Sequence, residues 1–251
     1  MSKQRKIKVG AVSYLNTKPL IFGFEQGLMK DQIELVNDYP SRIANMLLLD
    51  EIDVGLVPVA IIPKLQESHI ITNYCIGCDG AVASVCLFSE VPIEQIRKVL
   101  LDYQSRSSVA LARILIREHW KISPELTDAK EDFRNHISGT TAGLVIGDRA
   151  LEQRAISPYV YDLGQAWNEH TGLPFVFAAW VSNKKLEDPF IESFNNANKV
   201  GLQLIDEVIK RNPGTLFDLK EYYTHYISYT LDEKKKEGMQ LFLEKISAFA
   251  L

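Results

Sequence analysis

The chain has 251 residues, with 28 Lys and Arg against 32 Asp and Glu, and a formal net charge of -4 at pH 7. This length suffices for one large domain or two modest lobes with a sizeable core, which excludes a peptide-sized disulfide scaffold. The charges of both signs are interspersed and give no broad cationic face, so neither a nucleic acid nor a membrane is expected as a partner.

The N-terminal segment 1–6 is basic, but Lys8 interrupts the following apolar run, so no export signal is predicted. No apolar run approaches the ~18 residues of a membrane span. The three cysteines are an odd number, which suits a reducing compartment better than a secreted disulfide framework. We therefore expect a cytoplasmic protein. The sequence carries no signal for an oligomeric state.

The N-terminal part of the chain alternates strand and helix signals. Residues 7–12 alternate as a strand does and lead through a polar turn to Pro19, which suits the start of a helix. Residues 33–36 predict a second strand, and apolar residues at helical spacing follow Pro40. Residues 54–57 predict a third, buried strand. This order indicates an α/β unit.

A second α/β unit follows a predicted turn at residues 77–80. Residues 82–88 predict a strand, and residues 99–103 predict another that leads through a serine-rich loop into a helix. Residues 143–148 and 175–181 predict two further buried strands.

The last quarter of the chain is predicted to be helical. Asp188 is a good N-cap, Pro189 suits the first turn, and apolar residues from Phe190 to Val208 follow one helical face. The charge run 232–237 indicates a solvated helix face.

Together these elements predict an α/β fold of two lobes, with the chain crossing between them twice. The first lobe is expected to contain residues 1–85 and 178–251, including the C-terminal helices, and the second lobe residues 86–177. In such sheets, ligands bind beyond the carboxyl ends of the strands, at the loops that lead into helices. We therefore expect the ligand cleft between the lobes.

Common motifs for nucleotide, zinc-protease and serine-hydrolase chemistry are absent from the sequence. Cys75 and Cys78 have the C-x-x-C spacing of a redox pair or half a zinc site, but Cys86 lies on an apolar strand and no paired His is close. We favour two buried thiols that pack a turn. The five histidines are scattered, and His170, in a loop-like segment, is the remaining candidate for the cleft. No metal or cofactor is predicted.

Three predicted strand-to-helix loops offer hydrogen-bond donors to an anion. They contain Ser13, Asn16 and Thr17 in the first, Ser41 and Arg42 in the second, and Ser105, Arg106, Ser107 and Ser108 in the third. Helix N-termini favour carboxylates and phosphates, and hydroxyls add donors. The structural alternative is that these side chains, Asn16 included, cap their helices. Three such loops on two lobes favour a shared cleft for a small dianion.

The run Val9–Leu20, VGAVSYLNTKPL, resembles the N-terminal motif of the chorismate dehydratases of the futalosine route to menaquinone. Further segments resemble that family's blocks in the same order: residues 40–47, 53–58, 84–89, 102–108, 146–151 and 172–178. The ordered set spans most of residues 9–180. Ser107 stands where Thr is more usual in the family and keeps the hydroxyl.

The resemblance implies a type II periplasmic-binding-protein-like fold with the active site in the cleft. It also implies a carbon-oxygen lyase (hydro-lyase) that converts chorismate to 3-[(1-carboxyvinyl)oxy]benzoate and water without a metal or organic cofactor. Asn16 matches a residue assigned to the active site of the family. The alternatives are a non-catalytic cytoplasmic binding protein for a small carboxylate on the same fold, and another lyase or isomerase of a related cyclic carboxylate.

Within this hypothesis, Asn16 and Ser84 are the candidate catalytic residues. A carboxamide is a very weak base, so Asn16 is expected to orient the substrate, with the enolpyruvyl carboxylate of the substrate as an alternative base. Ser84 is expected to bind or protonate near the C4 hydroxyl. The candidate substrate-binding residues are Ser13, Thr17, Ser41, Ser105, Arg106, Ser107 and Asp148, with Ser105, Arg106 and Ser107 holding one carboxylate and Ser41 donating from the first lobe. Asp148 either contacts a hydroxyl or has a structural role in its turn.

Overall fold

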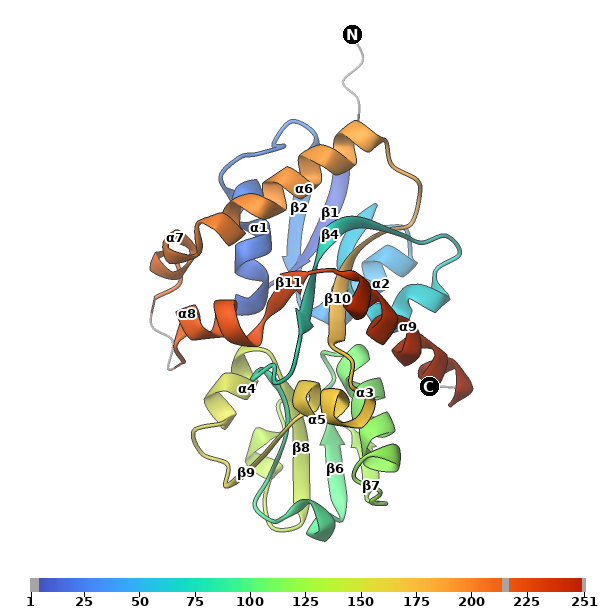
Figure 1. The fold of residues 1–251 in the computed structure, drawn as a ribbon, viewed down its shortest axis with the longest axis vertical. Helices are drawn as coiled ribbons and strands as arrows, with labels where there is room; N and C mark the ends of the chain where they lie inside the picture. The colour runs from blue at the N-terminus through green and yellow to red at the C-terminus, as the bar shows by residue number, and fades with distance from the viewer. Residues whose placement is uncertain (1–4, 214–216, 250–251) are drawn as a thin grey trace.

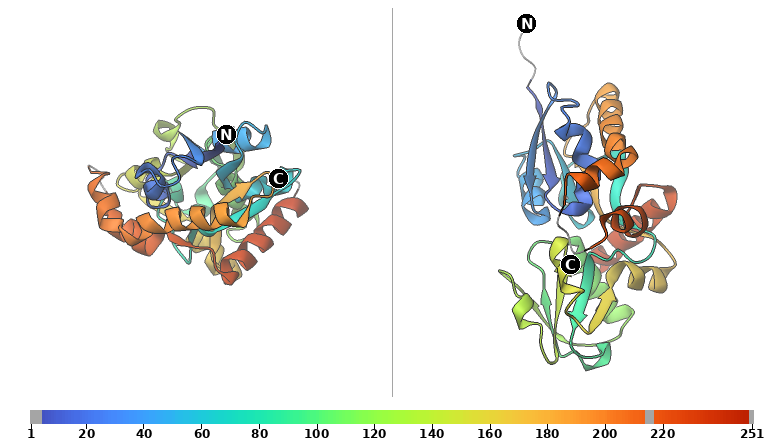
Figure 2. Two further views of the ribbon diagram at one scale, coloured as in Figure 1. Left: turned by 90° about the horizontal axis from the view of Figure 1, so that it is seen from above. Right: turned by 90° about the vertical axis from the view of Figure 1, so that its left-hand side faces the viewer.

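Two β-sheets organise the computed structural model, which describes residues 5–213 and 217–249. Each sheet forms the centre of one lobe, and the lobes lie one above the other in Figure 1 and in the right-hand view of Figure 2. This arrangement confirms the predicted α/β class with two lobes.

The first lobe contains a six-stranded sheet in the order β11-β4-β10-β3-β1-β2. Its strands are β1 (Ile7–Val12), β2 (Ile33–Asp38), β3 (Val54–Pro58), β4 (His69–Cys78), β10 (Phe175–Ser182) and β11 (Ser228–Thr230). Strand β1 is parallel to β2 and β3, whereas β10 is antiparallel to β3 and β4. The helices of this lobe are α1 (Lys18–Glu25), α2 (Pro40–Leu48), α6 (Asp188–Gln203), α7 (Ile205–Lys210), α8 (Leu219–Glu221) and α9 (Glu233–Ala248).

The second lobe contains a five-stranded sheet in the order β7-β6-β8-β5-β9. Its strands are β5 (Val85–Ser89), β6 (Lys98–Leu101), β7 (Glu125–Asp128), β8 (Thr141–Ile146) and β9 (Tyr159–Asp162), and its helices are α3 (Ser107–Glu118), α4 (Asp148–Gln153) and α5 (Leu163–Thr171). Strand β6 is parallel to β7 and β8, and β5 is antiparallel to β8 and β9.

The chain crosses between the lobes at residues 79–84 and again at residues 172–174. Strand β10 already pairs with β4 at Phe175, so residues 175–177 belong to the first sheet, although the predicted boundary assigned them to the second lobe. The first crossing is held to the second lobe, because the Asp162 carboxylate at the end of β9 accepts hydrogen bonds from the N–H groups of Val82 (3.0 Å) and Ala83 (2.8 Å).

Several local predictions differ from the structure. Cys75 and Cys78 lie within strand β4 and not in a turn, because this segment pairs with β10 and β11. Residues 82–84 are outside β5, since their N–H groups are directed to Asp162 and to local turns. The predicted helix after Pro189 is divided at Leu204, where the backbone leaves helical geometry (φ -119°, ψ 39°). The last quarter also contains a strand, β11.

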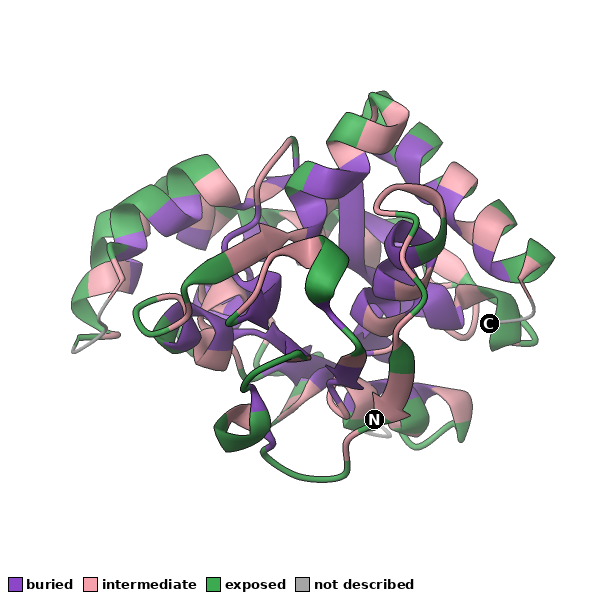
Figure 3. Cartoon of the chain, turned by 90° about the horizontal axis from the view of Figure 1, so that it is seen from below, coloured by how far each residue is buried: buried purple, intermediate pink, exposed green. Residues whose placement is uncertain are grey.

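The hydrophobic core of the first lobe lies between its sheet and the helices that cover it. Trp180 of β10 is fully buried and makes edge contacts with Phe24 of α1 (6.2 Å between ring centroids) and Phe194 of α6 (5.0 Å). Figure 3 shows the same organisation from below, with buried strands inside and the exposed residues on the outer faces of the helices. These buried strands fix the loops at their carboxyl ends.

Candidate active site

A cavity lies between the lobes, beyond the carboxyl ends of β1, β3 and β8. Its empty volume, counted together with the open solvent at its mouth, is about 490 Å³. It is lined by Val12, Tyr14, Asn16, Thr17, Pro40, Pro58, Ile76, Val82, Ser84, Val85, Ser105, Ser108, Ile146, Gly147, Phe177 and Ala178. Most of these residues are apolar, and a few hydroxyl and amide groups lie among them. Such a lining suits a small ligand with an apolar ring and polar substituents.

Asn16 lies in a 3-10 turn, Leu15–Thr17, that joins β1 to α1. Its side chain is half-buried at the cavity, and its Oδ1 accepts a hydrogen bond from Thr17 Oγ1 at 3.3 Å. The Tyr229 hydroxyl donates to the Asn16 carbonyl at 2.9 Å and so holds the turn. Thr17, not Asn16, is the N-cap of α1, and no side chain caps that helix. The capping alternative for Asn16 is therefore not observed.

Ser84 is fully buried in the first crossing segment, and it lines the cavity. Its Oγ has no hydrogen-bond partner of ordinary geometry among the described residues. The preceding Ala83 has a φ of 63°, a backbone conformation that non-glycine residues rarely adopt and that often occurs at functional sites. A buried hydroxyl without a partner costs about 1–3 kcal/mol, so this group points to a ligand that it binds.

The serine-rich loop at the start of α3 was predicted to bind an anion as a unit, but its residues have different roles in the structure. Ser105 lines the cavity, and its Oγ accepts from the Ser108 N–H at 3.1 Å, which leaves its own proton for a ligand. Ser107 does not line the cavity, because its Oγ accepts from the Ala60 N–H at 3.1 Å. Arg106 is also outside the cavity lining and donates to Asn45 Oδ1 of α2.

The remaining predicted residues divide between the cavity and its surroundings. Thr17 lines the cavity, whereas Ser13 is exposed and does not. Ser41 donates its backbone N–H to the Gln104 carbonyl at 3.1 Å, across the gap between the lobes. The structure therefore brings Asn16, Thr17, Ser84 and Ser105 together in the cavity, and it uses Ser41, Arg106, Ser107 and Asp148 in contacts between the lobes.

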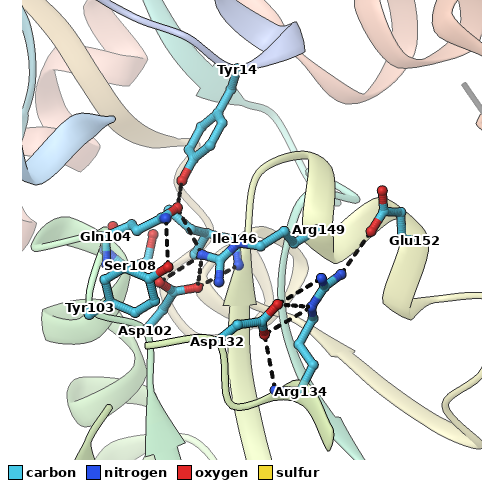
Figure 4. Close-up of polar contacts among 11 residues, drawn as sticks. Tyr14, Asp102, Tyr103, Gln104, Ser108, Asp132, Arg134, Ile146, Arg149 and Glu152 are labelled. Carbon is cyan, nitrogen blue, oxygen red and sulfur yellow. Dashed lines mark hydrogen bonds and ion pairs between the residues drawn. The ribbon is translucent and has the colours of Figure 1, made fainter. Parts of the chain in front are cut away.

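A polar network next to the cavity also joins the lobes (Figure 4). The Tyr14 hydroxyl of the first lobe donates to Gln104 Oε1 of the second, and Arg149 Nη2 donates to the same oxygen at 2.9 Å. Arg149 Nη2 also contacts both carboxylate oxygens of Asp102, at 2.9 and 2.7 Å, in a pair where the Asp102 side chain is fully buried.

Burial sets the protonation of the groups around this junction. It raises the pKa of Tyr14, and the Asp102 charge raises it further, so the Tyr14 hydroxyl keeps its proton and acts as a donor. Burial also raises the pKa of Asp148, and the hydrogen bond from the Leu15 N–H opposes that rise.

Sequence reasoning missed Tyr14 as a cavity residue, although it lies inside the N-terminal segment that carries the family resemblance, whereas Ser108, named among the donors of the third loop, does line the cavity. It also missed the tyrosines at positions 222 and 229, which come from a distant part of the chain. His170 belongs to helix α5 and not to a loop, and its Nε2 lies 3.1 Å from Glu118 Oε2. It is absent from the cavity lining.

The C-x-x-C cysteines and Cys86 are buried free thiols, and burial raises the pKa of Cys75 to about 12. Among residues 5–213 and 217–249, no three His, Cys, Asp or Glu side chains gather as metal ligands. Within the same part of the chain, no helix is both long and apolar enough to cross a membrane.

Comparisons with solved structures agree with the two-lobed fold. A protein from Archaeoglobus fulgidus superposes with a TM-score of 0.78 at 16% identity, covering 99% of this chain and 98% of that one. A Candida albicans gene product, described as exhibiting the generic periplasmic binding protein structural fold, has a TM-score of 0.61 at 14% identity, covering 98% and 95%. These likenesses confirm the predicted periplasmic-binding-protein-like fold.

Sequence comparisons point to one family. A chorismate dehydratase of Thermus thermophilus is 26% identical over 265 residues, covering 96% of each chain. A chorismate dehydratase of Campylobacter jejuni is 24% identical over 250 residues, covering 96% of this chain and 98% of the relative. The model of a family described as menaquinone biosynthesis matches residues 7–248. Because this match spans nearly the whole sequence, the chain belongs to that menaquinone-biosynthesis family.

Proposed function

We propose that the protein is a chorismate dehydratase, a hydro-lyase that converts chorismate to 3-[(1-carboxyvinyl)oxy]benzoate and water in the futalosine route to menaquinone. The observation that carries this proposal is the cavity in which Asn16, Thr17 and Ser84 meet between the lobes. The family match and the names of the two relatives support the same activity. We place the enzyme in the cytoplasm.

The chemistry of the substrate defines what the site must do. Chorismate is a cyclohexadiene with a ring carboxylate, an enolpyruvyl ether at C3 and a hydroxyl at C4. Loss of the C3 hydrogen as a proton and of the C4 hydroxyl as hydroxide makes the ring aromatic and yields one water. The electrons of the C3–H bond form the new C3=C4 double bond and those of the C4–O bond leave with the hydroxide, so the step has no net redox change and consumes no redox cofactor.

Removal of the C3 proton requires stabilisation of the negative charge that it leaves behind. The C1=C2 double bond conjugates C3 with the ring carboxylate, so proton loss produces a dienolate-like charge on that carboxylate. Hydrogen-bond donors aimed there lower the barrier. The Ser105 hydroxyl at the N-terminus of α3 is a suitable donor, because its oxygen already accepts from the Ser108 N–H and its proton is free for the ligand.

Asn16 and Ser84 have different roles in this mechanism. Asn16 orients the substrate through its amide, while the enolpyruvyl carboxylate, next to C3, takes the proton and passes it to the departing C4 oxygen. Ser84, with an otherwise unpaired buried hydroxyl, donates a hydrogen bond to that oxygen as negative charge develops on it.

The test is incubation of the purified protein with chorismate. An aromatic product, lower in mass than chorismate by one water, is expected to accumulate as chorismate is consumed. A protein that binds chorismate but leaves it unchanged over hours would be a binding protein on the same fold, and the proposal would be wrong.

A further inference from the structure

Three buried tyrosines come from the segment between α8 and the end of β11. Tyr222 and Tyr223 lie in a π-helical turn, Tyr222–Tyr226, and Tyr229 lies in β11. Their exposed fractions are 0%, 2% and 7%. The segment runs along the side of the first lobe that faces the second (Figure 1). Single π-turns within proteins are frequent at functional sites, because they redirect side chains that a regular helix would place elsewhere.

Tyr229 holds the turn that carries Asn16. Its hydroxyl donates to the Asn16 carbonyl at 2.9 Å, across more than two hundred residues of sequence. The Asn16 backbone is thus held by a residue of β11, at the edge of the first sheet. The position of the Asn16 amide in the cavity depends on a residue that does not itself line the cavity.

Tyr222 is placed differently, because its hydroxyl has no hydrogen-bond partner of ordinary geometry among the described residues. The Ser84 and Asn16 side chains both act on this hydroxyl as hydrogen-bonding groups and oppose the rise in pKa that burial causes. Ser84 Oγ is likewise buried and has no partner of ordinary geometry in the described part of the chain. Because Ser84 and Tyr222 interact and both hydroxyls are buried and unpaired among the described residues, only a small shift is needed to form a hydrogen bond of ordinary geometry between them.

We propose that Tyr222 is a positioning residue that directs the Ser84 hydroxyl into the cavity when substrate binds. A serine hydroxyl has one proton and two acceptor positions. If the Tyr222 hydroxyl donates to Ser84 Oγ, the Ser84 proton points away from Tyr222 and toward the departing C4 oxygen. This inference rests on the proposed dehydratase function and adds a residue to it.

The surroundings of Tyr222 keep it in the donor form. Burial and the nearby Asp148 charge both raise the pKa of its hydroxyl, so the phenol stays neutral throughout the physiological range. Tyr222 therefore supplies a hydrogen bond and does not give up its proton. The proton that leaves with the C4 oxygen comes from the substrate carboxylate.

The test compares Tyr222→Phe with Tyr223→Phe in the full chain. Tyr223 is a matched control, because it is a neighbouring buried tyrosine whose hydroxyl also lacks a partner among the described residues, while burial and the Asp148 charge, and neither Ser84 nor Asn16, shift its pKa. Tyr222→Phe is expected to lower kcat about tenfold with KM changed less than about threefold, as the loss of one hydrogen bond in the transition state predicts. Tyr223→Phe is expected to change neither.

Thermal unfolding separates this role from a structural one. Removal of a buried hydroxyl that has no partner relieves a desolvation cost, so the melting temperature of Tyr222→Phe is expected to equal or exceed that of the wild type. A loss of activity that follows a loss of stability would instead indicate a structural tyrosine and overturn the proposal.

A double-mutant cycle with Ser84→Ala identifies the partner. If Tyr222 acts through Ser84, adding Tyr222→Phe to Ser84→Ala should cause no further loss of kcat. An equal tenfold loss in both backgrounds would overturn the route through Ser84. A wild type that does not dehydrate chorismate would contradict the proposed function itself, whereas an active wild type with unchanged Tyr222→Phe would contradict only the role of Tyr222.

Discussion

The Asp148 carboxylate of the second lobe accepts a hydrogen bond from the backbone N–H of Leu15 in the first lobe, at 3.0 Å. Leu15 directly precedes Asn16, so this contact ties the α4 N-terminus to the turn that carries the candidate catalytic amide. Burial raises the pKa of Asp148, which means that the charged carboxylate is less stable here than in water. The junction therefore combines a useful hydrogen bond with an unfavourable charge.

Asp148→Asn is expected to keep the acceptor for the Leu15 N–H and to remove the charge, so its stability at pH 7 should equal or exceed that of the wild type. Because the folded-state pKa of Asp148 is raised, the folded wild type takes up a proton before the unfolded chain does. The free energy of unfolding of the wild type should therefore rise relative to that of the variant as pH falls from neutral toward the ordinary Asp pKa of about 4. Denaturant unfolding at several pH values tests this, and an advantage of the variant that grows toward acid pH would contradict it.

Asn16→Ala is expected to lower turnover by roughly 10² or more, about 2.7 kcal/mol of transition-state stabilisation, and to leave product affinity within about tenfold. Asn16→Asp should be no better than Ala if Asn16 orients a dianionic substrate, because a carboxylate there repels it. An Asp variant that exceeds Ala would make position 16 the base. Asn37, exposed on β2, offers Asn37→Ala as a control. Near-normal turnover in Asn16→Ala would remove Asn16 from the mechanism.

Gly147→Ala is expected to disturb the cavity strongly, although it adds only one methyl group. Gly147 has a φ of 64° and a ψ of -147°, and a Cβ there would lie 2.8 Å from the Tyr14 ring across the lobes. We expect a stability loss of about 1–3 kcal/mol and reduced turnover as Tyr14 is displaced. Gly139→Ala is the control, because its φ of 56° is also positive but no heavy atom lies within 4 Å of the added Cβ. Equal effects of the two substitutions would show that the Tyr14 contact is unimportant.

Arg149→Met tests the buried ion pair of Figure 4. It leaves the fully buried Asp102 carboxylate without its partner, and we expect a loss of about 3–5 kcal/mol in the free energy of unfolding. Arg134→Met is the matched comparison, since the partners of Arg134, Asp132 and Glu152, are largely solvent-accessible. That variant should lose about 1 kcal/mol or less. Urea unfolding measures the stability of both variants. Comparable losses in the two would contradict the larger contribution expected from the buried ion pair.

Much of the secondary structure could be predicted because it depends on local patterns. The alternation in residues 7–12 and the prolines at the starts of α2 and α6 act within a few residues, and the structure has these elements where they were expected. The predictions failed where pairing over long distances decided the outcome. The segment around Cys75 is a strand because it pairs with β10 and β11, and the local sequence does not indicate those partners.

The candidate site shows the same division. The family resemblance pointed to Asn16 and Ser84 on local motifs, and both line the cavity. The roles of the other polar loop residues depended on how the two lobes pack together. A serine such as Ser107 can bind an anion or a backbone group, depending on what lies opposite it. Here the Ala60 N–H lies opposite Ser107 and donates to its hydroxyl. Tyr222 lies more than a hundred residues from Ser84, and only packing brought their two hydroxyls close together. Local sequence patterns determined most of the strands, helices and loops. The pairing and burial of distant groups, which depend on the whole folded chain, determined the remaining strands, such as β11 and the Cys75 segment of β4, and also which polar atoms remain available to a substrate.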